Sequence, residues 1–544
     1  MKQLSNLGKR IQQTIYRSTI GLPAVNRFLT KSANTLLHHK RFAAVLAVTA
    51  IAVIGIAVLK PQGTGAQSGN TNPDYTNVRD ALQGYTHILR QDDLVVNYGI
   101  NNTAYPDYLA ASVSAFTTND SNGSQNFDGF EIPGVCDSCD YTTLNYKQDK
   151  TIVTGRFFNT SQDNVISYPS RRDNQERVEV MTGNRNGNGN ASFAWTSSQL
   201  LPYETNNTTI SQGYAADFNG DGYDDLLMTY SDYTQLINNN GRMRIATAVN
   251  VDTPSAGFDF GTEHPFGFSE GIRGVAVGDF NGDFQPDIAV LRVQNDNNLY
   301  LGIFSVDYQT LQITFRGQVT VDGLPDSGQN QPIQIAAGNF TGSLNQQLVI
   351  GNQSGPNKTT KVRIFDFAEN SYQPVVKQTY DSGATATNIK ILTGTYDWSS
   401  PYDVITFMQS KLDHNNSKSF VYILSVDNQS YAITQSAVVD VLGTYGANLE
   451  VNKVAVDIAM GNFNNLKPNP ADPSQKINDP NLQLAVAIAY DMGADQNGGR
   501  KLTEGTVNIV RVIDPGTGSM SLAPLVTKLV VPSGGNLNSN FNQF

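Results

Sequence analysis

Hydrophobic residues along most of this chain occur in short runs, separated by turns rich in Asn, Gly, Asp and Ser. One well-marked unit places apolar runs at 275–277, 288–291, 299–304, 313–315 and 319–321. Runs of about four to eight residues rich in Val, Ile, Tyr, Phe and Thr are typical of β-strands. We therefore expect an all-β fold with four strands in each unit of about sixty residues.

One turn returns about every sixty residues. In its clearest copies a small residue is followed by Asp, Phe, Asn, Gly and Asp. Its copies are anchored at Tyr98, Gly155, Ala216, Gly278, Gly338, Gly394 and Gly461, and the first of them matches only faintly, through 105–110. A repeat of this length with four strands corresponds to one propeller blade, and a ring of blades leaves only short, protected strand edges. The sequence predicts a seven-bladed β-propeller.

The segment 467–476 interrupts the last repeat. It is polar and contains three prolines, so we expect an inserted loop in that blade. Three apolar runs follow it, at 484–488, 507–512 and 525–531, and these supply the remaining strands. The ring is therefore expected to close within this chain.

The first eighty residues differ from the rest. Residues 1–41 carry eight Lys or Arg and no Asp or Glu, and 42–59 is an uncharged apolar run. As a helix of about 1.5 Å per residue, such a run reaches about 27 Å, enough to cross a bilayer. The preceding positive charge predicts a cytoplasmic N-terminus and an extracytoplasmic propeller, so the protein is expected in the cell membrane, spanning it once. The alternative is a signal peptide cleaved near Ala66, which would make the protein secreted.

Four regions follow from these patterns: a basic cytoplasmic segment (1–41), a transmembrane anchor (42–59), a flexible stalk (60–84) and the propeller (85–544). The whole chain has a formal net charge of −11, so the part beyond the basic segment is more acidic still. An acidic body argues against nucleic acid as a partner, because phosphate binding requires a basic surface. Cys136 and Cys139 are the two cysteines, and export favours a local disulfide between them over free thiols.

Two copies of the turn carry oxygen-bearing side chains at positions 1, 3, 5 and 9. A backbone carbonyl at position 7 adds a fifth oxygen. The first loop offers Asp217, Asn219, Asp221, Tyr223 and Asp225, and the second offers Asp279, Asn281, Asp283, Gln285 and Asp287. Calcium takes six to eight oxygen ligands, and this alternate spacing directs one loop's oxygens toward a single point. Gly222 permits the sharp turn of the first loop, whereas Phe284 stands at that position in the second and is expected to weaken it.

An EF-hand uses a similar opening but requires a glutamate at position 12 and flanking helices. Position 12 of the first loop is Met228, inside an expected strand, so an EF-hand is excluded. Asp, Asn and Gly are also ordinary turn formers, which leaves a turn without an ion as the alternative.

With these residues the chain resembles the FG-GAP or VCBS repeat proteins, among them the propellers of integrin α-subunits. The resemblance implies that the ten residues above bind two structural calcium ions, and it covers roughly residues 85–544. Other copies depart from the pattern: Asn339, Thr341 and Ser343 provide no carboxylate, Arg156 places a cation at the first position, and the copy with Asp397 and Asp403 keeps two carboxylates. We expect these loops to keep the turn without the ion.

No catalytic motif is evident. The sequence contains no H-E-x-x-H motif or phosphate-cradling loop, and its five histidines lack partner motifs. Its one G-x-S-x-G string, at 267–271, leads into an expected strand, whereas a catalytic serine elbow leads into a helix. We therefore expect a non-enzymatic module for binding or adhesion, whose partner is an extracellular protein or glycan. The alternatives are a scaffold in an envelope or secretion assembly, and a hydrolase or lyase acting on extracellular polysaccharide.

Overall fold

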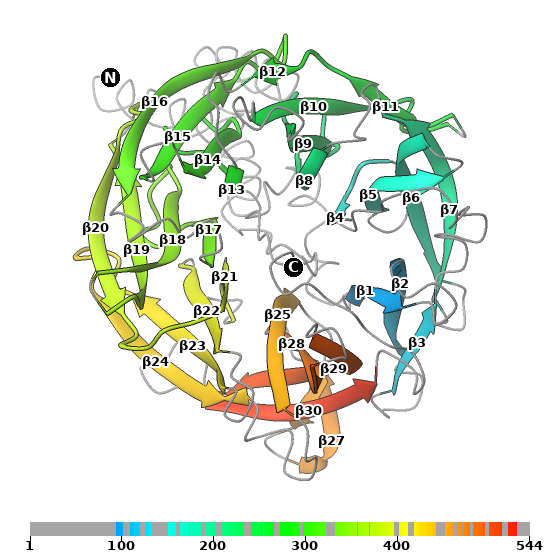
Figure 1. Cartoon of the computed structure of the whole chain (residues 1–544), viewed down its shortest axis with the longest axis vertical. Helices are drawn as coiled ribbons and strands as arrows, with labels where there is room; N and C mark the ends of the chain where they lie inside the picture. Colours follow the sequence, from blue (N-terminus) through cyan, green and yellow to red (C-terminus); the bar gives the residue numbers. More distant parts are fainter. Residues whose placement is uncertain are drawn as a thin grey trace, which may run out of the picture.

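In the computed structural model, β-sheets stand around a central axis, with each sheet running from the axis to the rim (Figure 1). The structure describes residues 94–101, 109–119, 126–131, 151–158, 164–172, 175–185, 191–201, 208–232, 241–253, 255–265, 272–293, 298–321, 332–355, 357–368, 370–396, 402–411, 418–441, 452–461, 466–469, 472–478, 482–494, 500–513 and 521–529. Within these ranges the fold is an all-β ring of antiparallel sheets, as the sequence predicts.

Except where β26 (Leu466–Asn469) and β27 (Asp472–Asn478) intervene in the last sheet, the strands of each sheet follow one another in the chain, and hydrogen-bonded neighbours are antiparallel. The first sheets contain β1 (Leu94–Asn101), β2 (Leu109–Asn119) and β3 (Asn126–Glu131), then β4 (Thr151–Gly155), β5 (Asn164–Arg172), β6 (Gln175–Arg185) and β7 (Ala191–Leu200). The next contains β8 (Thr208–Ala216), β9 (Asp225–Asp232), β10 (Gly241–Val249), β11 (Gly257–Phe260) and β12 (His264–Pro265).

The following three sheets have four strands each. They contain β13 (Ile272–Gly278), β14 (Asp287–Val293), β15 (Leu299–Val306) and β16 (Ile313–Val321); β17 (Ile333–Gly338), β18 (Gln347–Ser354), β19 (Thr359–Phe367) and β20 (Pro374–Asp381); and β21 (Asn388–Gly394), β22 (Val404–Lys411), β23 (Lys418–Val426) and β24 (Ile433–Asp440). The last sheet joins β25 (Asn452–Gly461), β28 (Gln483–Ala494), β29 (Arg500–Ile513) and β30 (Ser521–Leu529).

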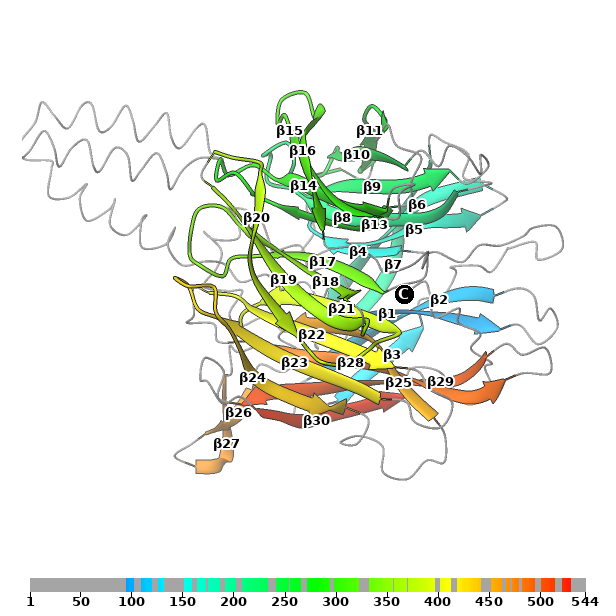
Figure 2. The ribbon, with the colours of Figure 1, turned by 60° about the vertical axis from the view of Figure 1, so that its left-hand side comes forward.

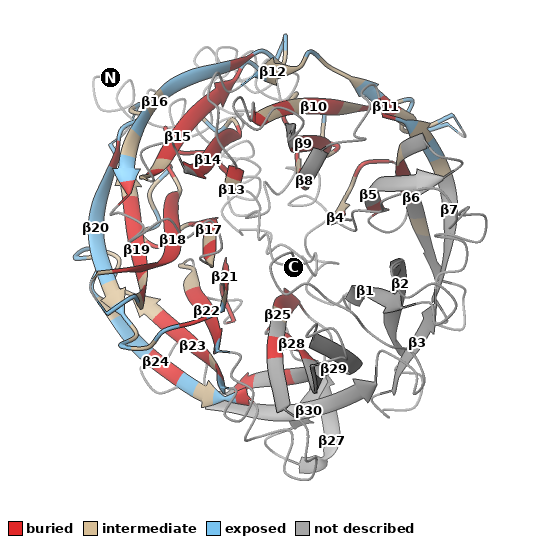
Figure 3. Ribbon diagram, in the orientation of Figure 1, coloured by how far each residue is buried: buried red, intermediate tan, exposed pale blue. Residues whose placement is uncertain are grey.

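In the sheets β13–β16, β17–β20 and β21–β24, where burial is described along nearly every strand, it decreases toward the strand at the rim. The side chains of β14 and β15 are almost all buried, whereas β16 and β20 expose most of theirs (Figure 3). This gradient explains the sequence pattern, because continuous apolar runs lie in the middle strands and alternating runs lie at the rim. The two apolar runs at 313–315 and 319–321 form the single strand β16, which is irregular near Gly317.

The aromatic residue of the repeated turn is buried between neighbouring sheets. Phe218, Phe280, Phe340 and Tyr396 are each at most 1% exposed. Phe280, for example, lies in a cluster that joins its own sheet to β17 and β18, and its ring stacks on Phe367 with centroids 5.1 Å apart. The recurring aromatic residue therefore holds one sheet to the next.

In two of the copies, close packing leaves no room for a side chain two residues before this aromatic residue. A Cβ atom at Gly278 would lie 2.7 Å from the Phe280 ring and 2.7 Å from Gln346 Oε1. At Gly338 a Cβ atom would lie 2.8 Å from the Phe340 ring and 2.9 Å from Thr393. The aromatic ring thus folds back over a residue that has no side chain.

The expected loop at 467–476 is instead part of a hairpin. β26 (Leu466–Asn469) pairs with β27 (Asp472–Asn478) between β25 and β28, and the hairpin projects from the body of the ring (Figure 2). Its place between two blade strands is the expected one. The prediction of a loop was wrong because Pro468 marks only a bulge in the hairpin, where the register shifts.

The predicted anchor (42–59), stalk (60–84) and basic segment (1–41) lie outside the described residues. So do Cys136 and Cys139. Within the described ranges no helix has the length and apolar character needed to cross a membrane.

The close packing at Gly278 gives the first prediction. Gly278→Ala should destabilise the fold by about 1–3 kcal/mol, because the added methyl group forces the Phe280 ring or Gln346 to move. Chemical denaturation monitored by tryptophan fluorescence measures the change. Gly302→Ala is the matched control, since its Cβ atom would meet its nearest neighbour at 3.4 Å. Equal effects of the two substitutions would contradict this account of the motif.

Candidate metal centre

The two acidic loops occupy equivalent places in the ring. Residues 217–224 connect β8 to β9, and 279–286 connect β13 to β14, so each loop joins the two innermost strands of its sheet. The last predicted ligand of each loop, Asp225 or Asp287, is the first residue of the second strand. The structure therefore brings the five predicted ligands of each loop into one tight turn.

In the first loop, side-chain oxygens accept hydrogen bonds from the loop's own backbone. Asp217 accepts from the N–H groups of Asp221 and Gly222, both at 3.0 Å. Asn219 Oδ1 accepts from Asp221 N–H at 2.8 Å, and Asp221 Oδ1 accepts from Tyr223 N–H at 2.8 Å. These bonds turn the oxygens at positions 1, 3 and 5 toward the inside of the loop.

The second loop repeats this arrangement and is more deeply buried. Asp279 accepts from Gly282 N–H and Phe284 N–H, both at 2.7 Å, and is 4% exposed. Asn281 is 6% exposed, whereas the equivalent Asn219 is only partly buried. Phe284 has a φ of 68°, in the left-handed region where Gly222 of the first loop has a φ of 95°. The aromatic residue therefore takes up the turn of glycine at a cost in backbone strain.

The carboxylates at position 9 are the most deeply buried acids of the two loops. Asp225 is 0% exposed and accepts from Phe218 N–H at 3.2 Å and Ala248 N–H at 3.1 Å. Burial, and then the charge of Asp217, raise the pKa of Asp225 well above its usual value. Burial, and then the charge of Asp283, raise the pKa of Asp287 to about 9.

The acids at position 1 are shifted in the same direction. Burial raises the pKa of Asp217 to about 6, with the charge of Asp221 as the next cause. Burial likewise raises the pKa of Asp279 to about 6, although backbone N–H groups of Phe284 and Gly282 oppose the shift. Raised pKa values mean that the charged forms lack full compensation, and a cation would supply it.

The donors fit calcium by their chemistry, since they are carboxylate, amide and carbonyl oxygens in part-buried loops. The carboxylate oxygens of each loop lie farther apart than the ligands of a bound metal ion. Within the described ranges no three acidic, histidine or cysteine side chains lie close enough together to hold a metal ion. The loops therefore present a calcium-type donor set whose carboxylates bind backbone N–H groups.

A pair of hydrogen bonds links several of these turns to the next sheet, and the sequence did not reveal it. Asp279 N–H donates to Gln346 Oε1 at 3.0 Å, and Gln346 N–H donates to the carbonyl of Asp279 at 2.6 Å. The same reciprocal pair joins Arg156 to Asp224 and Asn339 to Asp403. We call this pair the seam clamp.

The seam clamp changes the role of one predicted residue. Asp403 was expected to be one of two carboxylates left in its own degenerate loop, but its Oδ2 accepts from Asn339 N–H of the preceding sheet at 2.6 Å. The other carboxylate, Asp397, lies outside the described residues. At the seam after Asp217, the clamp position is Pro286, which has no N–H group to donate.

Tyr372 is a second functional residue that sequence reasoning missed. It lies just before β20 in the next sheet, and its hydroxyl accepts from Asn281 Nδ2 at 2.6 Å. Asn281 Nδ2 also donates to Asp283 Oδ2 at 2.8 Å, so both sides of this amide nitrogen are occupied. The amide oxygen is thereby held toward the loop. The available signal was a tyrosine that returns one repeat later as Tyr431.

The architecture and the loops define a class of protein: a repeat protein of the β-propeller type. The family model for the FG-GAP repeat matches residues 211–242, which contain the first acidic loop. The chain thus carries an FG-GAP repeat at 211–242, as its turns suggested. A search of curated proteins finds no match to it.

Several solved structures are similar to parts of the chain. A putative 6-phosphogluconolactonase from Bacteroides uniformis is 10% identical, with 81% of this chain and 100% of that chain covered and a TM-score of 0.38. AofleA from Arthrobotrys oligospora is 9% identical over 71% and 91% of the two chains, with a TM-score of 0.33. The Dos1 propeller is 9% identical over 72% and 87%, with a TM-score of 0.31. Scores this low carry no argument about function.

The contact between Tyr372 and Asn281 gives the second prediction. Tyr372→Phe should lower the free energy of unfolding by about 1 kcal/mol, because it leaves a part-buried amide N–H without its acceptor. Denaturant titration measures the change. Tyr308→Phe, at a tyrosine that is 45% exposed, is the control and should have little effect. A Tyr372→Phe protein as stable as the control would contradict the assigned role.

Proposed function

We propose that this protein is a calcium-stabilised, extracytoplasmic β-propeller that serves as a binding or adhesion module. The observation that carries the calcium part is the burial of Asp225 and Asp287 beside other carboxylates, with raised pKa values in both. A carboxylate in such a place favours a cation over solvent. The ligands of the proposed ions are the ten residues of the two loops, and the ions are structural.

We further propose that the ring has seven blades. Its supports are the seven anchors in the sequence and the succession of sheets from β1–β3 to β25–β30. The apolar run 42–59 supports a membrane anchor with the ring outside the membrane. The proposed partner is an extracellular protein or glycan, bound through loops at the edges of the ring.

The proposed module has no catalytic activity. The sequence has no H-E-x-x-H or phosphate-cradling motif, and its one G-x-S-x-G string precedes an expected strand and not a helix. The assignment of the clustered carboxylates to turns and seams gives further support. A scaffold role in an envelope assembly uses the same features, and the experiments below separate it from binding to an external ligand.

The third prediction concerns the ions. Chelation with EGTA should lower the melting temperature of the protein, because calcium at a hundredfold excess over its Kd stabilises the native state by about 2.7 kcal/mol. Asp217→Ala combined with Asp279→Ala should remove most of this response. Calorimetry in calcium and in EGTA measures it.

The control for this experiment is Asp259→Ala, at an exposed acid outside both loops. It should leave the response to calcium unchanged. Native protein that melts at the same temperature in calcium and in EGTA would refute the calcium proposal.

The fourth prediction concerns the partner. On intact cells, protease should reach the ring, and membranes should retain the protein through a high-salt wash. Purified calcium-loaded protein should bind a glycan or a surface protein in an array and a pull-down. Binding to neither would weigh against an external ligand, and migration of the native protein in a stable complex would then favour the scaffold. Hydrolysis of a polysaccharide by the purified protein would refute the non-enzymatic assignment.

A further inference from the structure

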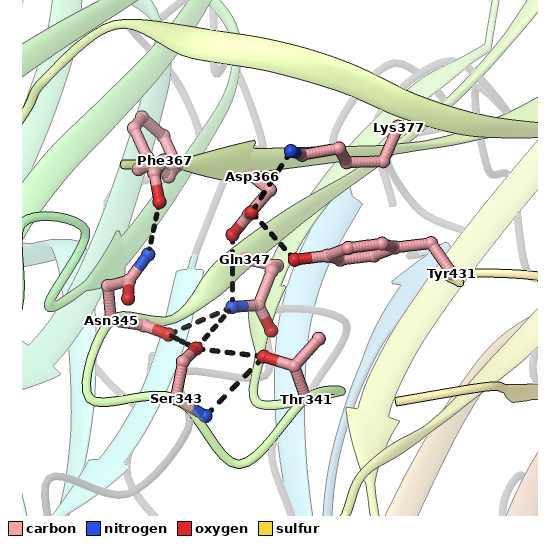
Figure 4. Close-up of polar contacts among 8 residues, drawn as sticks. All are labelled: Thr341, Ser343, Asn345, Gln347, Asp366, Phe367, Lys377 and Tyr431. Carbon is pink, nitrogen blue, oxygen red and sulfur yellow. Dashed lines mark hydrogen bonds and ion pairs between the residues drawn. The ribbon is translucent and has the colours of Figure 1, made fainter. Parts of the chain in front are cut away.

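The turn that follows the two acidic loops in the chain, called the third loop below, has their shape but a different chemistry. Residues 339–346 connect β17 to β18, and Gln347 is the first residue of β18, where the other loops have Asp225 and Asp287. Positions 1, 3, 5 and 7 of the third loop are Asn339, Thr341, Ser343 and Asn345. None of these carries a charge, yet the turn is retained (Figure 4).

The side-chain oxygen of Gln347 accepts the same backbone hydrogen bond that Asp225 and Asp287 accept in the other loops. Gln347 Oε1 accepts from Phe340 N–H at 2.9 Å. Asp225 accepts from Phe218 N–H at 3.2 Å, and Asp287 accepts from Phe280 N–H at 3.1 Å. In all three loops, then, the residue at position 9 fixes the backbone of the buried aromatic residue.

The side-chain nitrogen of Gln347 makes contacts that the aspartates have no atom to make. Nε2 lies 2.9 Å from Ser343 Oγ and 2.9 Å from the carbonyl oxygen of Asn345. These oxygens stand at positions 5 and 7, the same positions whose oxygens would ligate calcium in the first two loops. Gln347 is 0% exposed, so this amide reaches them from inside the turn.

A third contact ties the amide to the rest of the blade. Gln347 Nε2 lies 3.2 Å from Asp366 Oδ1 on β19. The other oxygen of Asp366 accepts from the hydroxyl of Tyr431 at 2.6 Å and lies 3.5 Å from Lys377 Nζ. Tyr431 belongs to the next sheet along the chain, just before β24 (Figure 4). Asp366, the carboxylate that the Gln347 amide contacts, therefore has its own cation and a second donor.

From these contacts we infer that the Gln347 amide fills the ion position of the third loop. An uncharged N–H donor group joins the oxygens whose counterparts in the acidic loops would ligate calcium, and it belongs to the chain itself. The third loop then holds its shape without calcium, unlike the two acidic loops for which calcium is proposed. The comparison rests on the proposed calcium loops, but the contacts of Gln347 stand without them.

Gln347→Glu tests this inference, because it keeps the acceptor for Phe340 N–H, removes the donor and introduces a charge. In EGTA the full-length variant should melt at least about 2 °C below the native protein, since the new carboxylate faces the oxygens of Ser343, Asn345 and Asp366. In calcium, part of this loss should be recovered, because an ion takes the place of the amide. Gln378→Glu, the same change on the exposed strand β20, is the matched control and should shift neither value.

Two results would overturn the inference. The first is a melting temperature of the Gln347→Glu protein in EGTA that equals that of the Gln378→Glu control. The second is a decrease in melting temperature that is equally large in calcium and in EGTA. If the native protein binds no calcium at all, the proposed function fails. The loss in EGTA and its recovery in calcium still decide the present inference.

A second measurement does not depend on the folding of Gln347→Glu. Terbium luminescence should detect no bound ion in the Asp217→Ala/Asp279→Ala protein, whose third loop is intact. An ion that stays bound in this protein and is lost on the further change Asn339→Ala would overturn the inference.

Discussion

The ring depends on one close approach, that of an aromatic ring to a backbone without a side chain. Where Phe280 folds back over Gly278, its ring fills the space between two sheets and stacks on Phe367 of the next one. The same approach recurs at Gly155 and Gly338, whereas the buried aromatic residues that follow Ala216 and Gly394 pack without it. A dense packing of this kind leaves little room for alternatives at the glycine or at the ring.

In three of the turns, a polar side chain is hydrogen-bonded to the backbone of the buried aromatic residue. The residue at position 9 binds the backbone N–H of the aromatic residue, so its side chain is drawn into the interior of the protein. Once there, a carboxylate carries a charge away from water, and an amide carries a second hydrogen-bonding group that also needs a partner. Asp225 and Gln347 therefore both need a polar partner inside the turn. The pKa of Asp225 is raised by burial, whereas the Gln347 amide contacts Ser343 Oγ and the Asn345 carbonyl.

The sequence predicted the parts of this design that repeat. The period, the strands between 275 and 321, four to most sheets, and the place of the acidic loops all follow from patterns that recur from unit to unit. What it did not predict are contacts between units. The seam clamp joins Asp279 to Gln346, and Tyr372 reaches Asn281, across large separations in the chain. Gln346 and Tyr372 are common residue types, so the sequence around them gives no sign of these contacts.

The connection between the first and second strands of each sheet has a meaning of its own. In the first two cases described it holds an acidic turn, in the next an amide-filled turn, and between β25 and β28 a projecting hairpin. The strands on either side keep their pairing in every case. The segment between the first and second strands can therefore differ in length and sequence while the strand pairing stays the same, which makes it a suitable place for grafting a new loop. New loops placed there would take the position of an acidic loop without having to preserve its chemistry.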